Sequence, residues 1–491
     1  MRTRFAPSPT GFMHLGNLRT ALYTYLLAKK NGGSFVLRIE DTDRERFVSG
    51  ATETIYNTLR YCGLDWDEGP DKGGKFGPYV QSERQGLYKK YAEQLVANGG
   101  AYRCFCTTER MNELHRQQKA NGIALSYDRH CRDLTADETA KLLEEGAPYV
   151  IRQKVPLEGT TTFKDEIYGE ITVPNADLDD QILLKSDGMP TYNFANVIDD
   201  HLMEITHVVR GCEYLSSAPK YELLYKSFGW TPPVYIHVQQ IMRDETHKLS
   251  KRDGDAYFED FLKKGYLAEV IINYIALLGW SPGGENEIFS LLELIEAFDI
   301  SGLSKSPAIF DEVKMRAING IYIRTLTPEE FQGYAEPVVR EASRKAAAEC
   351  VDFDVLCKAL QPRTEILNDI IELVDFIDET LPYDAEWFVN KKMKTTKESS
   401  LIALKTSLPY LEQMDKNNFT LERVQAQLSK AIAELNVKNG SVLWPIRLAL
   451  SGKMSTPGGG AELCAIVGKA QAIKRIEQAI LKLEEAIQKD D

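Results

Sequence analysis

The sequence of 491 residues predicts an α/β chain in which one parallel sheet is interrupted by an inserted segment and followed by an all-helical region. Three observations support this fold class. A strand–helix–strand pattern fills residues 3–39, helix–strand alternation resumes near Thr191, and only helical periodicity is found after about Thr325. Parallel sheets of this kind bind ligands at the carboxyl ends of their strands. Functional residues are therefore expected in the loops that follow the strands.

The first part of the pattern is a strand, a helix and a second strand. Residues 3–6 predict a short apolar strand, which leads into the loop Pro7-Ser8-Pro9-Thr10-Gly11. The apolar positions of the following helix recur at helical spacing and are Leu18, Ala21, Leu22, Tyr25 and Leu26. After a glycine pair at 32–33, residues 35–39 predict the second strand, which ends in Glu40-Asp41-Thr42-Asp43. This order predicts a βαβ unit.

The chain is too long for one hydrophobic core, so we expect several structural units. Residues 101–190 are less regular than their neighbours, and we interpret them as an insertion between two halves of the sheet domain, at 1–100 and 191–254. Residues 255–325 form a further segment, and 326–491 a helical region. Two apolar stripes are expected to form the core of that region: Ile366, Ile370, Leu373, Val374 and Ile377, and Ile473, Ile476, Ile480, Leu483 and Ile487.

Composition restricts the class of protein. The chain is 43% hydrophobic and 27% charged, which is ordinary for a globular protein. We find neither a signal-peptide pattern nor an apolar stretch long enough to cross a bilayer, and the 8 scattered cysteines fit a reducing compartment, so we expect a cytoplasmic protein. The net charge of −13 argues against a general nucleic-acid-binding protein and by itself favours a metabolic enzyme. RNA binding would need a local basic face.

The loop between the first strand and its helix suits a phosphate group. The helix that follows it presents free N–H groups and the positive end of its dipole. His14 can donate a hydrogen bond to a phosphate oxygen, and Gly16 leaves space for a nucleotide beside the backbone. A His-x-Gly pattern alone is weak, and an ordinary loop histidine is the alternative interpretation.

Charged residues elsewhere could bind small charged groups, although an isolated glutamate or arginine is usually a surface residue. Glu40 can hold an ammonium group, and the planar guanidinium of Arg4 can bind a carboxylate. The segment Lys248-Leu249-Ser250-Lys251-Arg252 supplies cations for phosphates, although a basic pentapeptide is usually a solvated loop. A similar stretch, Lys453-Met454-Ser455-Thr456-Pro457, lies in the helical region and lacks the second lysine, so we reject it as a functional motif.

The inserted segment holds a cluster of thiols. Cys104, Cys106 and Cys131 offer three thiolates, and one further donor would complete a tetrahedral structural zinc site. Buried free cysteines are the alternative interpretation. His130 and Asp133 are chemically ordinary candidates for the fourth ligand.

Taken together, these motifs resemble the bacterial glutamyl-tRNA synthetases, a class I family. Residues 6–22 resemble its "HIGH" region, residues 190–201 its next characteristic block, and residues 248–252 its "KMSKS" loop. The resemblance covers essentially the whole chain, including 304–311 and 444–452. It departs at Cys212, where an acidic residue is common, and at Ala317, where a tryptophan is usual.

The resemblance implies a domain order. It gives a Rossmann-type class I synthetase catalytic domain in two halves, at 1–100 and 191–254, with an inserted acceptor-binding domain at 101–190. A stem-contact domain at 255–325 and an all-helical anticodon-binding domain at 326–491 follow.

The resemblance also implies an activity. Such an enzyme activates L-glutamate with ATP, releases pyrophosphate, and transfers glutamate to the 3′ end of tRNA(Glu); whether tRNA(Gln) is also charged stays open. Magnesium is expected with ATP, held mainly by phosphates and water. A monomer is expected by analogy, as is a requirement for bound tRNA in glutamate activation.

The resemblance assigns roles to residues of this sequence. The implied catalytic residues are His14, Lys248 and Lys251. The implied ATP-binding residues are His14, Gly16, Asn17, Leu249 and Lys251. The implied glutamate-binding residues are Arg4, Ala6, Ser8, Glu40, Tyr192, Asn196 and Arg210. Two arginines and one acidic residue suit a ligand with two carboxylates and one amine, which favours glutamate over glutamine.

The resemblance leaves the fourth zinc ligand open. The related glutamyl-queuosine synthetases have a Cys-x-Cys…Tyr-x-x-x-Cys site, which maps onto Cys104, Cys106, Tyr127 and Cys131. Some zinc-containing glutamyl synthetases use a histidine two residues beyond the last cysteine, and that position is Asp133 here. We favour Tyr127 and expect the zinc to stabilise the insertion without taking part in the chemistry.

Sequence features argue against four other classes of protein. Glutamyl-queuosine synthetases lack an anticodon domain, and bacterial glutaminyl enzymes have β-barrels where this chain is helical. A small nucleotidyltransferase would need neither the tRNA-sized appendages nor the loop at 248–252. A non-enzymatic RNA-binding paralogue should have lost His14, Glu40 or Lys251, and all three are present.

Overall fold

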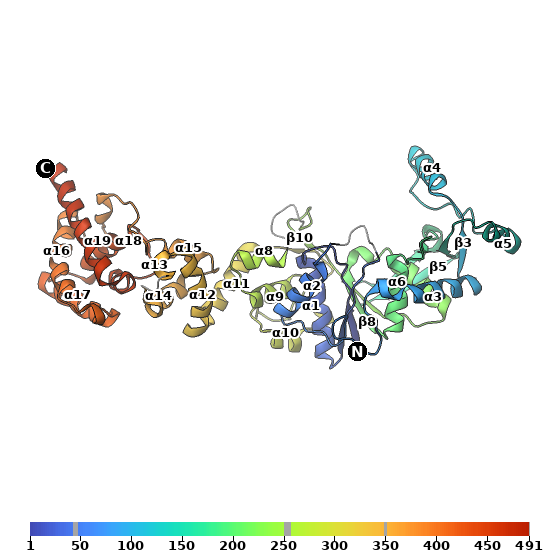
Figure 1. Cartoon of the computed structure of the whole chain (residues 1–491), viewed down its shortest axis with the longest axis horizontal. Coiled ribbons are helices and arrows are strands. Elements are labelled where there is room, and N and C mark those ends of the chain that lie inside the picture. Colours follow the sequence, from blue (N-terminus) through green and yellow to red (C-terminus); the bar gives the residue numbers. More distant parts are fainter. Residues whose placement is uncertain (43–47, 250–256, 348–350, 491) are drawn as a thin grey trace. The chain divides into compact units, whose positions relative to one another are not determined.

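The computed structural model describes residues 1–42, 48–249, 257–347 and 351–490. The chain divides into two compact units (Figure 1). Unit 1 comprises Met1–Phe261 and Ile271–Asp311, and unit 2 comprises Leu262–Val270 and Glu312–Asp491. Within the described ranges, no helix is both long and apolar enough to span a membrane.

Unit 1 is built on a six-stranded sheet with the order β2-β1-β8-β9-β5-β6. Neighbouring strands pair in parallel from β2 to β5, and β6 pairs antiparallel with β5. The strands are β1 (Arg2–Phe5), β2 (Ser34–Leu37), β5 (Thr160–Asp165), β6 (Gly169–Pro174), β8 (His207–Gly211) and β9 (Val234–Val238). The predicted parallel sheet is confirmed, and strands from distant parts of the sequence meet in it.

Six helices surround the strands of unit 1. They are α1 (Leu15–Lys30), α2 (Ala51–Tyr61), α3 (Gln85–Ala97), α6 (Tyr192–Leu202), α7 (Ala218–Phe228) and α10 (Leu291–Ala297). Two of them, α1 and α7, contact the six-stranded sheet most extensively. Helix α1 packs on β1, β2 and β8, as the predicted βαβ unit requires. It begins at the cap residue His14 and ends in two lysines, before Gly32 adopts a left-handed φ of 58°.

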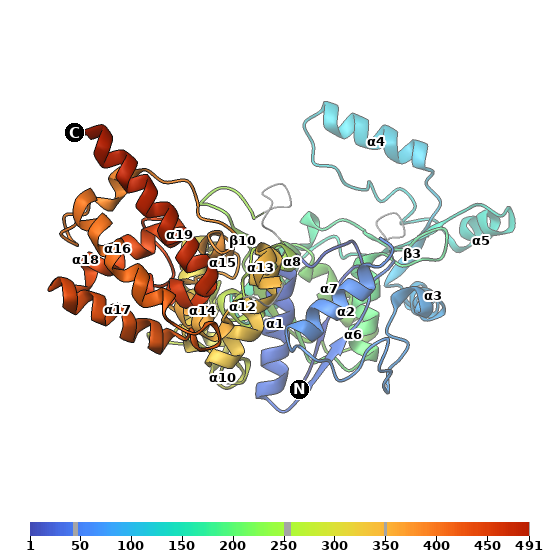
Figure 2. The same cartoon turned by 60° about the vertical axis from the view of Figure 1, so that its left-hand side comes forward.

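The segment predicted as an insertion contributes to two sheets. Strands β3 (Ala101–Cys104), β4 (Val150–Gln153) and β7 (Ile182–Leu184) form a separate antiparallel sheet. The β5–β6 hairpin instead pairs with β9 of the main sheet. Helices α4 (Thr108–Ala120) and α5 (Ala136–Glu144) stand apart from both sheets in the two views of Figures 1 and 2. The sequence reasoning did not predict that this hairpin joins the main sheet.

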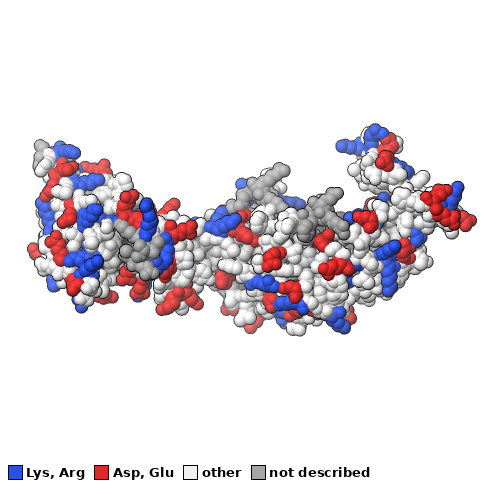
Figure 3. All heavy atoms as spheres, viewed as in Figure 1, with Lys and Arg blue, Asp and Glu red and all other residues white. Residues whose placement is uncertain are grey.

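A short parallel pair, β10 (Ile241–Met242) and β11 (Ala308–Ile309), completes the strands of unit 1. Helices α8 (Phe258–Lys263) and α9 (Ala268–Leu277) each contain one boundary between the two units, and a third boundary lies between Asp311 and Glu312. In the view of Figure 3, acidic and basic side chains are interspersed, and no continuous basic surface covers this face of the described residues.

Unit 2 is helical. Its helices are α11 (Glu312–Thr325), α12 (Pro328–Ala342), α13 (Arg344–Ala347), α14 (Phe353–Leu360), α15 (Asp369–Val374), α16 (Lys397–Glu412), α17 (Leu421–Leu435), α18 (Asn439–Ser451) and α19 (Gly460–Asp490). Helices α16–α19 pack together, and α19 has a kink at Gly468, where φ is 76°. Both predicted stripes contribute buried core residues, among them Ile370 and Val374 in the first, and Ile476 and Leu483 in the second.

Candidate active site

A cavity of about 330 Å³ opens at the carboxyl ends of β1, β8 and β9 in unit 1. Most of the predicted substrate and ATP residues line it: Arg4, Ala6, Ser8, His14, Gly16, Asn17, Tyr192, Arg210, Lys248 and Leu249. Glu40 and Asn196 are not among the lining residues. Lys251, predicted from the motif at 248–252, lies outside the described residues. The sheet therefore gathers residues that are far apart in sequence at one edge, as the parallel topology requires.

His14 caps the start of helix α1. Its Nδ1 accepts a hydrogen bond from the backbone N–H of Gly16 at 3.1 Å. A neutral imidazole that accepts at Nδ1 carries its proton on Nε2. His14 can therefore present a donor while it caps the helix, and the first helical N–H groups add positive potential beside it.

Beneath the cavity lies a buried network of charges. Asp200 Oδ1 accepts hydrogen bonds from Arg4 Nε at 3.0 Å and from Arg38 Nη1 at 2.8 Å. Arg38 Nη2 also donates to Glu40 Oε1 at 2.9 Å. Arg4, Arg38, Glu40 and Asp200 are all buried, and each charge in the network faces an opposite charge. The network holds Arg4 and Glu40 in fixed positions.

Glu40 keeps one oxygen available for a further donor. Its Oε2 has no hydrogen-bond partner among the described residues, although the group is buried. Burial raises the pKa of Glu40, while the cations Arg38 and Arg4 act in the opposite direction. A buried carboxylate oxygen without a donor is costly. An ammonium group at this position would remove that cost.

Arg210 reaches the cavity from β8. It is 5% exposed, and its guanidinium lies 4.6 Å from the ring of Tyr221 and 5.4 Å from those of Tyr214 and Tyr235. Its Nε donates to His237 Nε2 at 3.0 Å, whereas Nη2 has no hydrogen-bond partner among the described residues. Aromatic faces stabilise a cation without neutralising it. Arg210 therefore keeps its charge for an anion.

Helix α6 supplies the two remaining predicted substrate residues. Tyr192 lines the cavity, and its ring lies 5.4 Å from that of Tyr214. Burial, and then the carboxylate of Glu40, raises the pKa of Tyr192, so it stays a neutral phenol. Asn196 is buried and donates from Nδ2 to the carbonyl of Tyr192 at 3.1 Å. Asn196 thus supports Tyr192 from within the helix.

Several residues that line the cavity were not predicted from the sequence as site residues. They are Arg19 and Thr20 on α1, Glu213 and Tyr214 after β8, and Gln239 and Gln240 after β9. The residues after β8 and β9 could have been predicted, because ligands bind at the carboxyl ends of the strands in a parallel sheet. Arg19 lies in the stretch 6–22 that carries the resemblance, but nothing in its spacing gave it a role of its own; in the structure it is buried and donates to the carbonyl of Leu278 at 2.6 Å.

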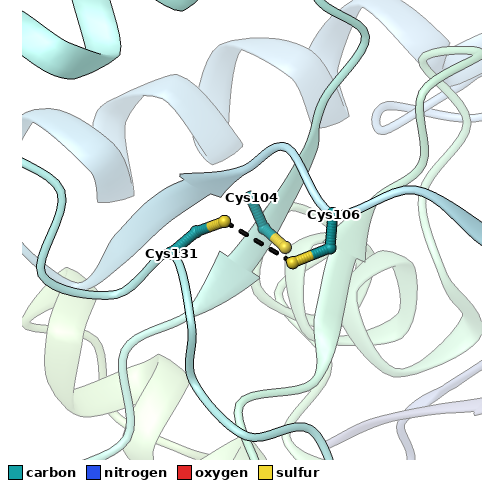
Figure 4. A group of neighbouring side chains, drawn as sticks. All are labelled: Cys104, Cys106 and Cys131. Carbon is teal, nitrogen blue, oxygen red and sulfur yellow. Dashed lines mark hydrogen bonds between the residues drawn. The ribbon is translucent and has the colours of Figure 1, made fainter. Parts of the chain in front are cut away.

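The thiol cluster forms a second candidate site, within the inserted segment. The Sγ atoms of Cys104, Cys106 and Cys131 lie within 4.8 Å of one another and point toward a common centre (Figure 4). Cys106 Sγ and Cys131 Sγ are 3.6 Å apart. A tetrahedral zinc with Zn–S bonds of about 2.3 Å has ligand separations of about 3.8 Å, so the geometry fits this metal.

Tyr127 is the closest of the three candidates for a fourth ligand. Its Oη lies 3.2 Å from Cys104 Sγ and 3.6 Å from Cys106 Sγ. His130 and Asp133 are exposed and do not belong to the cluster among the described residues. The hydrogen bond between Cys131 and Cys104 lowers the pKa of Cys104 and raises the pKa of Cys131, so the thiolate form is favoured at Cys104.

Comparisons with known proteins give the class of this chain. A family model described as the catalytic domain of class I tRNA synthetases (E and Q) matches residues 1–317, and a model of an anticodon binding domain matches residues 329–480. The first match covers more than half of the chain. The chain therefore belongs to the class I tRNA synthetases of the glutamate and glutamine group.

Relatives that match over their full length show to which family of this class the chain belongs. A glutamate–tRNA ligase of Clostridium botulinum (strain Loch Maree / Type A3) is 55% identical over 484 residues, which cover 99% of each chain. One of Clostridium novyi (strain NT) is 54% identical over 487 residues, again 99% of each. A solved glutamate tRNA ligase from Elizabethkingia meningosepticum, in complex with its amino acid, has a TM-score of 0.87 and 36% identity over 98% of this chain and 99% of that chain. Within its class, the chain belongs to the glutamate–tRNA ligase family.

The family assignment confirms the resemblance on which the sequence interpretation rested, and with it the synthetase fold and the helical anticodon-binding region. It excludes the nucleotidyltransferase interpretation, because the match extends over the whole chain. The roles of individual residues, the zinc and the bounds of the five domain segments stay predictions.

Proposed function

We propose that this cavity activates L-glutamate with ATP and that the enzyme transfers the glutamyl group to the 3′ end of tRNA(Glu). One observation carries the proposal: two buried arginines and the start of α1 line one cavity of about 330 Å³, and the buried carboxylate of Glu40 is linked to one of these arginines, Arg4, through Arg38 and Asp200. This set of charges matches a dicarboxylic amino acid beside a polyphosphate. The full-length relatives named glutamate–tRNA ligase support the same reaction.

The amino acid would be held by charge complementarity. Glu40 Oε2 binds the ammonium group and Arg4 the α-carboxylate, while Arg210 binds the side-chain carboxylate, with Ala6, Ser8, Tyr192 and Asn196 shaping the site. The charge of Arg210 favours glutamate over glutamine, because a neutral amide would leave the buried cation unpaired.

ATP would lie along the start of α1. Gly16 and Asn17 would face the nucleotide with Leu249, and His14 would donate to the α-phosphate. Lys248 and Lys251 would stabilise the charge that builds on the phosphoryl oxygens. Magnesium would accompany ATP, held mainly by phosphates and water, and would neutralise further phosphate charge.

The chemistry then needs no nucleophilic side chain. An oxygen of the glutamate α-carboxylate attacks the α-phosphorus, the bond to the bridging oxygen breaks, and pyrophosphate leaves. A hydroxyl of the terminal ribose of tRNA next attacks the carbonyl carbon of the adenylate, and AMP leaves. The protein aligns these groups and stabilises the developing charge.

The remaining segments would bind tRNA. We assign acceptor binding to 101–190, between the two catalytic halves at 1–100 and 191–254, stem contact to 255–325 and anticodon recognition to 326–491. A few anticodon contacts would decide whether tRNA(Gln) is charged as well. We expect a monomer in the cytoplasm, where tRNA and ATP are found.

The thiol cluster would hold a structural zinc with Cys104, Cys106, Cys131 and Tyr127 as ligands. The metal would tie the segment that carries Tyr127 and Cys131 to the end of β3, which carries Cys104. Metal analysis of the purified protein should find about one zinc per chain. The variant Cys106→Ser should lose it, whereas Cys464→Ser, in unit 2, should retain it. Zinc-free wild-type protein with an unchanged melting curve would contradict the assignment.

The first test of the function is charging of purified tRNA(Glu) and tRNA(Gln) with labelled glutamate, with and without ATP. ATP-dependent charging of tRNA(Glu) is the expected result, and the second tRNA shows whether the enzyme discriminates. Lys251→Ala should sharply reduce adenylate formation while glutamate binding stays near the wild-type level. If a folded preparation charges neither tRNA, the proposed function is wrong.

A further inference from the structure

Three buried polar side chains form a line that ends at the cavity. Arg210 Nε donates to His237 Nε2 at 3.0 Å, and His237 Nδ1 lies 2.7 Å from Asp165 Oδ2. The side chains of Asp165 and His237 are fully buried, and Arg210 is 5% exposed. The line therefore joins the β5–β6 hairpin to the substrate cavity through β9 and β8.

The strand register produces this line. Arg210 on β8 pairs directly with His237 on β9, so their side chains stand next to each other on the sheet. Asp165 is the last residue of β5 and pairs with Tyr235, two residues before His237. The backbone N–H of His237 also donates to Asp165 Oδ2 at 3.0 Å. Three neighbouring strands thus fix the order of the three side chains.

Asp165 is itself held firmly. Its Oδ1 accepts the backbone N–H groups of Ile167 and Tyr168, both at 2.9 Å, in the turn of the hairpin. A carboxylate that accepts from several fixed donors is held in one orientation. Asp165 can therefore act as a rigid acceptor for the imidazole.

The chemistry of the line defines the state of the imidazole. Arg210 can only donate, so His237 Nε2 must accept, and the single proton of the neutral ring must sit on Nδ1, where it is donated to Asp165. Asp165 thereby fixes the tautomer and the orientation of His237, and His237 in turn fixes the plane of the Arg210 guanidinium. Such a chain leaves the outer nitrogens of Arg210 available to a ligand.

The interposed ring also separates two opposite charges. Arg4 is bonded directly to the carboxylate of Asp200, which partly neutralises it. Arg210 instead meets a neutral imidazole, and the structure records no ion pair to it within the described ranges. A carboxylate in direct contact would compete with the anionic side chain of the substrate. A neutral acceptor orients the guanidinium and leaves its charge for the ligand.

We propose that His237 and Asp165 are positioning residues for amino-acid selection. They orient the guanidinium of Arg210 toward the side-chain carboxylate of glutamate and leave its positive charge without a neutralising acid. This inference rests on the proposed function. It assigns part of the amino-acid specificity to the β5–β6 hairpin, which lies in the sequence range predicted as the tRNA-binding insertion. The residues touch Arg210 rather than substrate.

The test compares two replacements of His237. His237→Leu removes the acceptor with little change in volume, whereas His237→Gln can offer its amide oxygen near the position of Nε2. For His237→Leu we expect the KM for glutamate to rise about tenfold to a hundredfold, since a loosely held group loses its orientation. The KM for ATP should stay within about twofold, and His237→Gln should recover most of the loss.

A matched control is His207→Leu, at the opposite end of β8, where the ring is partly exposed and bonded to Thr206. It should leave both KM values unchanged. If His237→Leu does not fold, His237→Asn serves in its place, because its short amide stays near Asp165 and withholds the acceptor from Arg210.

The outcomes separate this inference from the proposed function. If the wild-type enzyme does not charge tRNA with glutamate, the proposed function fails. If it does, and the glutamate KM of the variant rises less than about fivefold, or rises together with that for ATP, the positioning role is wrong. A selective rise that His237→Gln rescues supports it.

Discussion

Replacement of Arg210 by glutamine tests the electrostatic basis of glutamate selection. The change removes the buried cation of the cavity and keeps a polar side chain of moderate length. Because the Nε partner of Arg210 is the neutral ring of His237, the replacement leaves no buried acid without a partner. We therefore expect Arg210→Gln to fold, with a change in melting temperature of a few degrees at most, roughly 1 kcal/mol.

The magnitude follows from the burial of the guanidinium. Arg210 is 5% exposed and has an Nη2 with no hydrogen-bond partner among the described residues, so a bound carboxylate would form a desolvated charge pair with it. Removing one member of such a pair costs about 3–5 kcal/mol. Since about 1.36 kcal/mol corresponds to a factor of ten, kcat/KM for glutamate should fall by about 10²–10⁴-fold.

The assay is tRNA charging at glutamate concentrations below KM, with the KM for ATP measured in parallel. The loss should appear in the glutamate dependence and leave the KM for ATP within about twofold. A fall of less than tenfold in kcat/KM for glutamate, in a folded variant, would refute the electrostatic reasoning. If the KM for ATP changes as much as that for glutamate, Arg210 maintains the shape of the cavity as a whole and does not select glutamate.

Three further predictions follow from single side chains. Arg38→Met should lower the free energy of unfolding of unit 1 by about 3–5 kcal/mol, because Glu40 and Asp200 lose a buried partner; an unchanged urea midpoint would contradict this. Glu222→Gln should raise stability at pH 8 by about 1–3 kcal/mol and leave it unchanged near pH 5, as read from melting curves at both pH values. Burial raises the pKa of Glu222 to about 7, so the folded state loses stability as the pH rises from the unfolded value toward 7. Lys453→Met should leave adenylate formation within about twofold of wild type and cost about 1 kcal/mol of stability at most, since Lys453 binds an aspartate and a backbone carbonyl within unit 2.

For each of these three variants, the same assay also provides the control. For Glu222→Gln, an equal effect at pH 5 and pH 8 would show that ionisation is not the cause. For Lys453→Met, a strong loss of adenylate formation would restore the Lys-Met-Ser segment as a functional motif. For Arg38→Met, the loss should be confined to the unfolding transition of unit 1.

The sequence by itself determined the local parts of this enzyme. The strand–loop–helix around His14 and the acidic end of the second strand could be predicted, because short-range periodicity and turn chemistry specify them. The thiol spacing likewise predicted a cluster that the structure brings within 4.8 Å. The parallel topology could also be inferred, since a helix between two strands permits little else.

Only the tertiary structure decided which charged residues that are distant in sequence form ion pairs and hydrogen bonds with one another. The pairing of β5 with β9 puts Asp165 behind His237, and the packing of α6 puts Asp200 between Arg4 and Arg38. Glu40 proved to lie beneath the cavity rather than in its lining. No local pattern encodes these contacts, because strand order and register follow from which apolar faces bury one another across the whole sheet. The sequence thus identifies the groups that can bind substrate, and the fold determines which of their charges remain uncompensated.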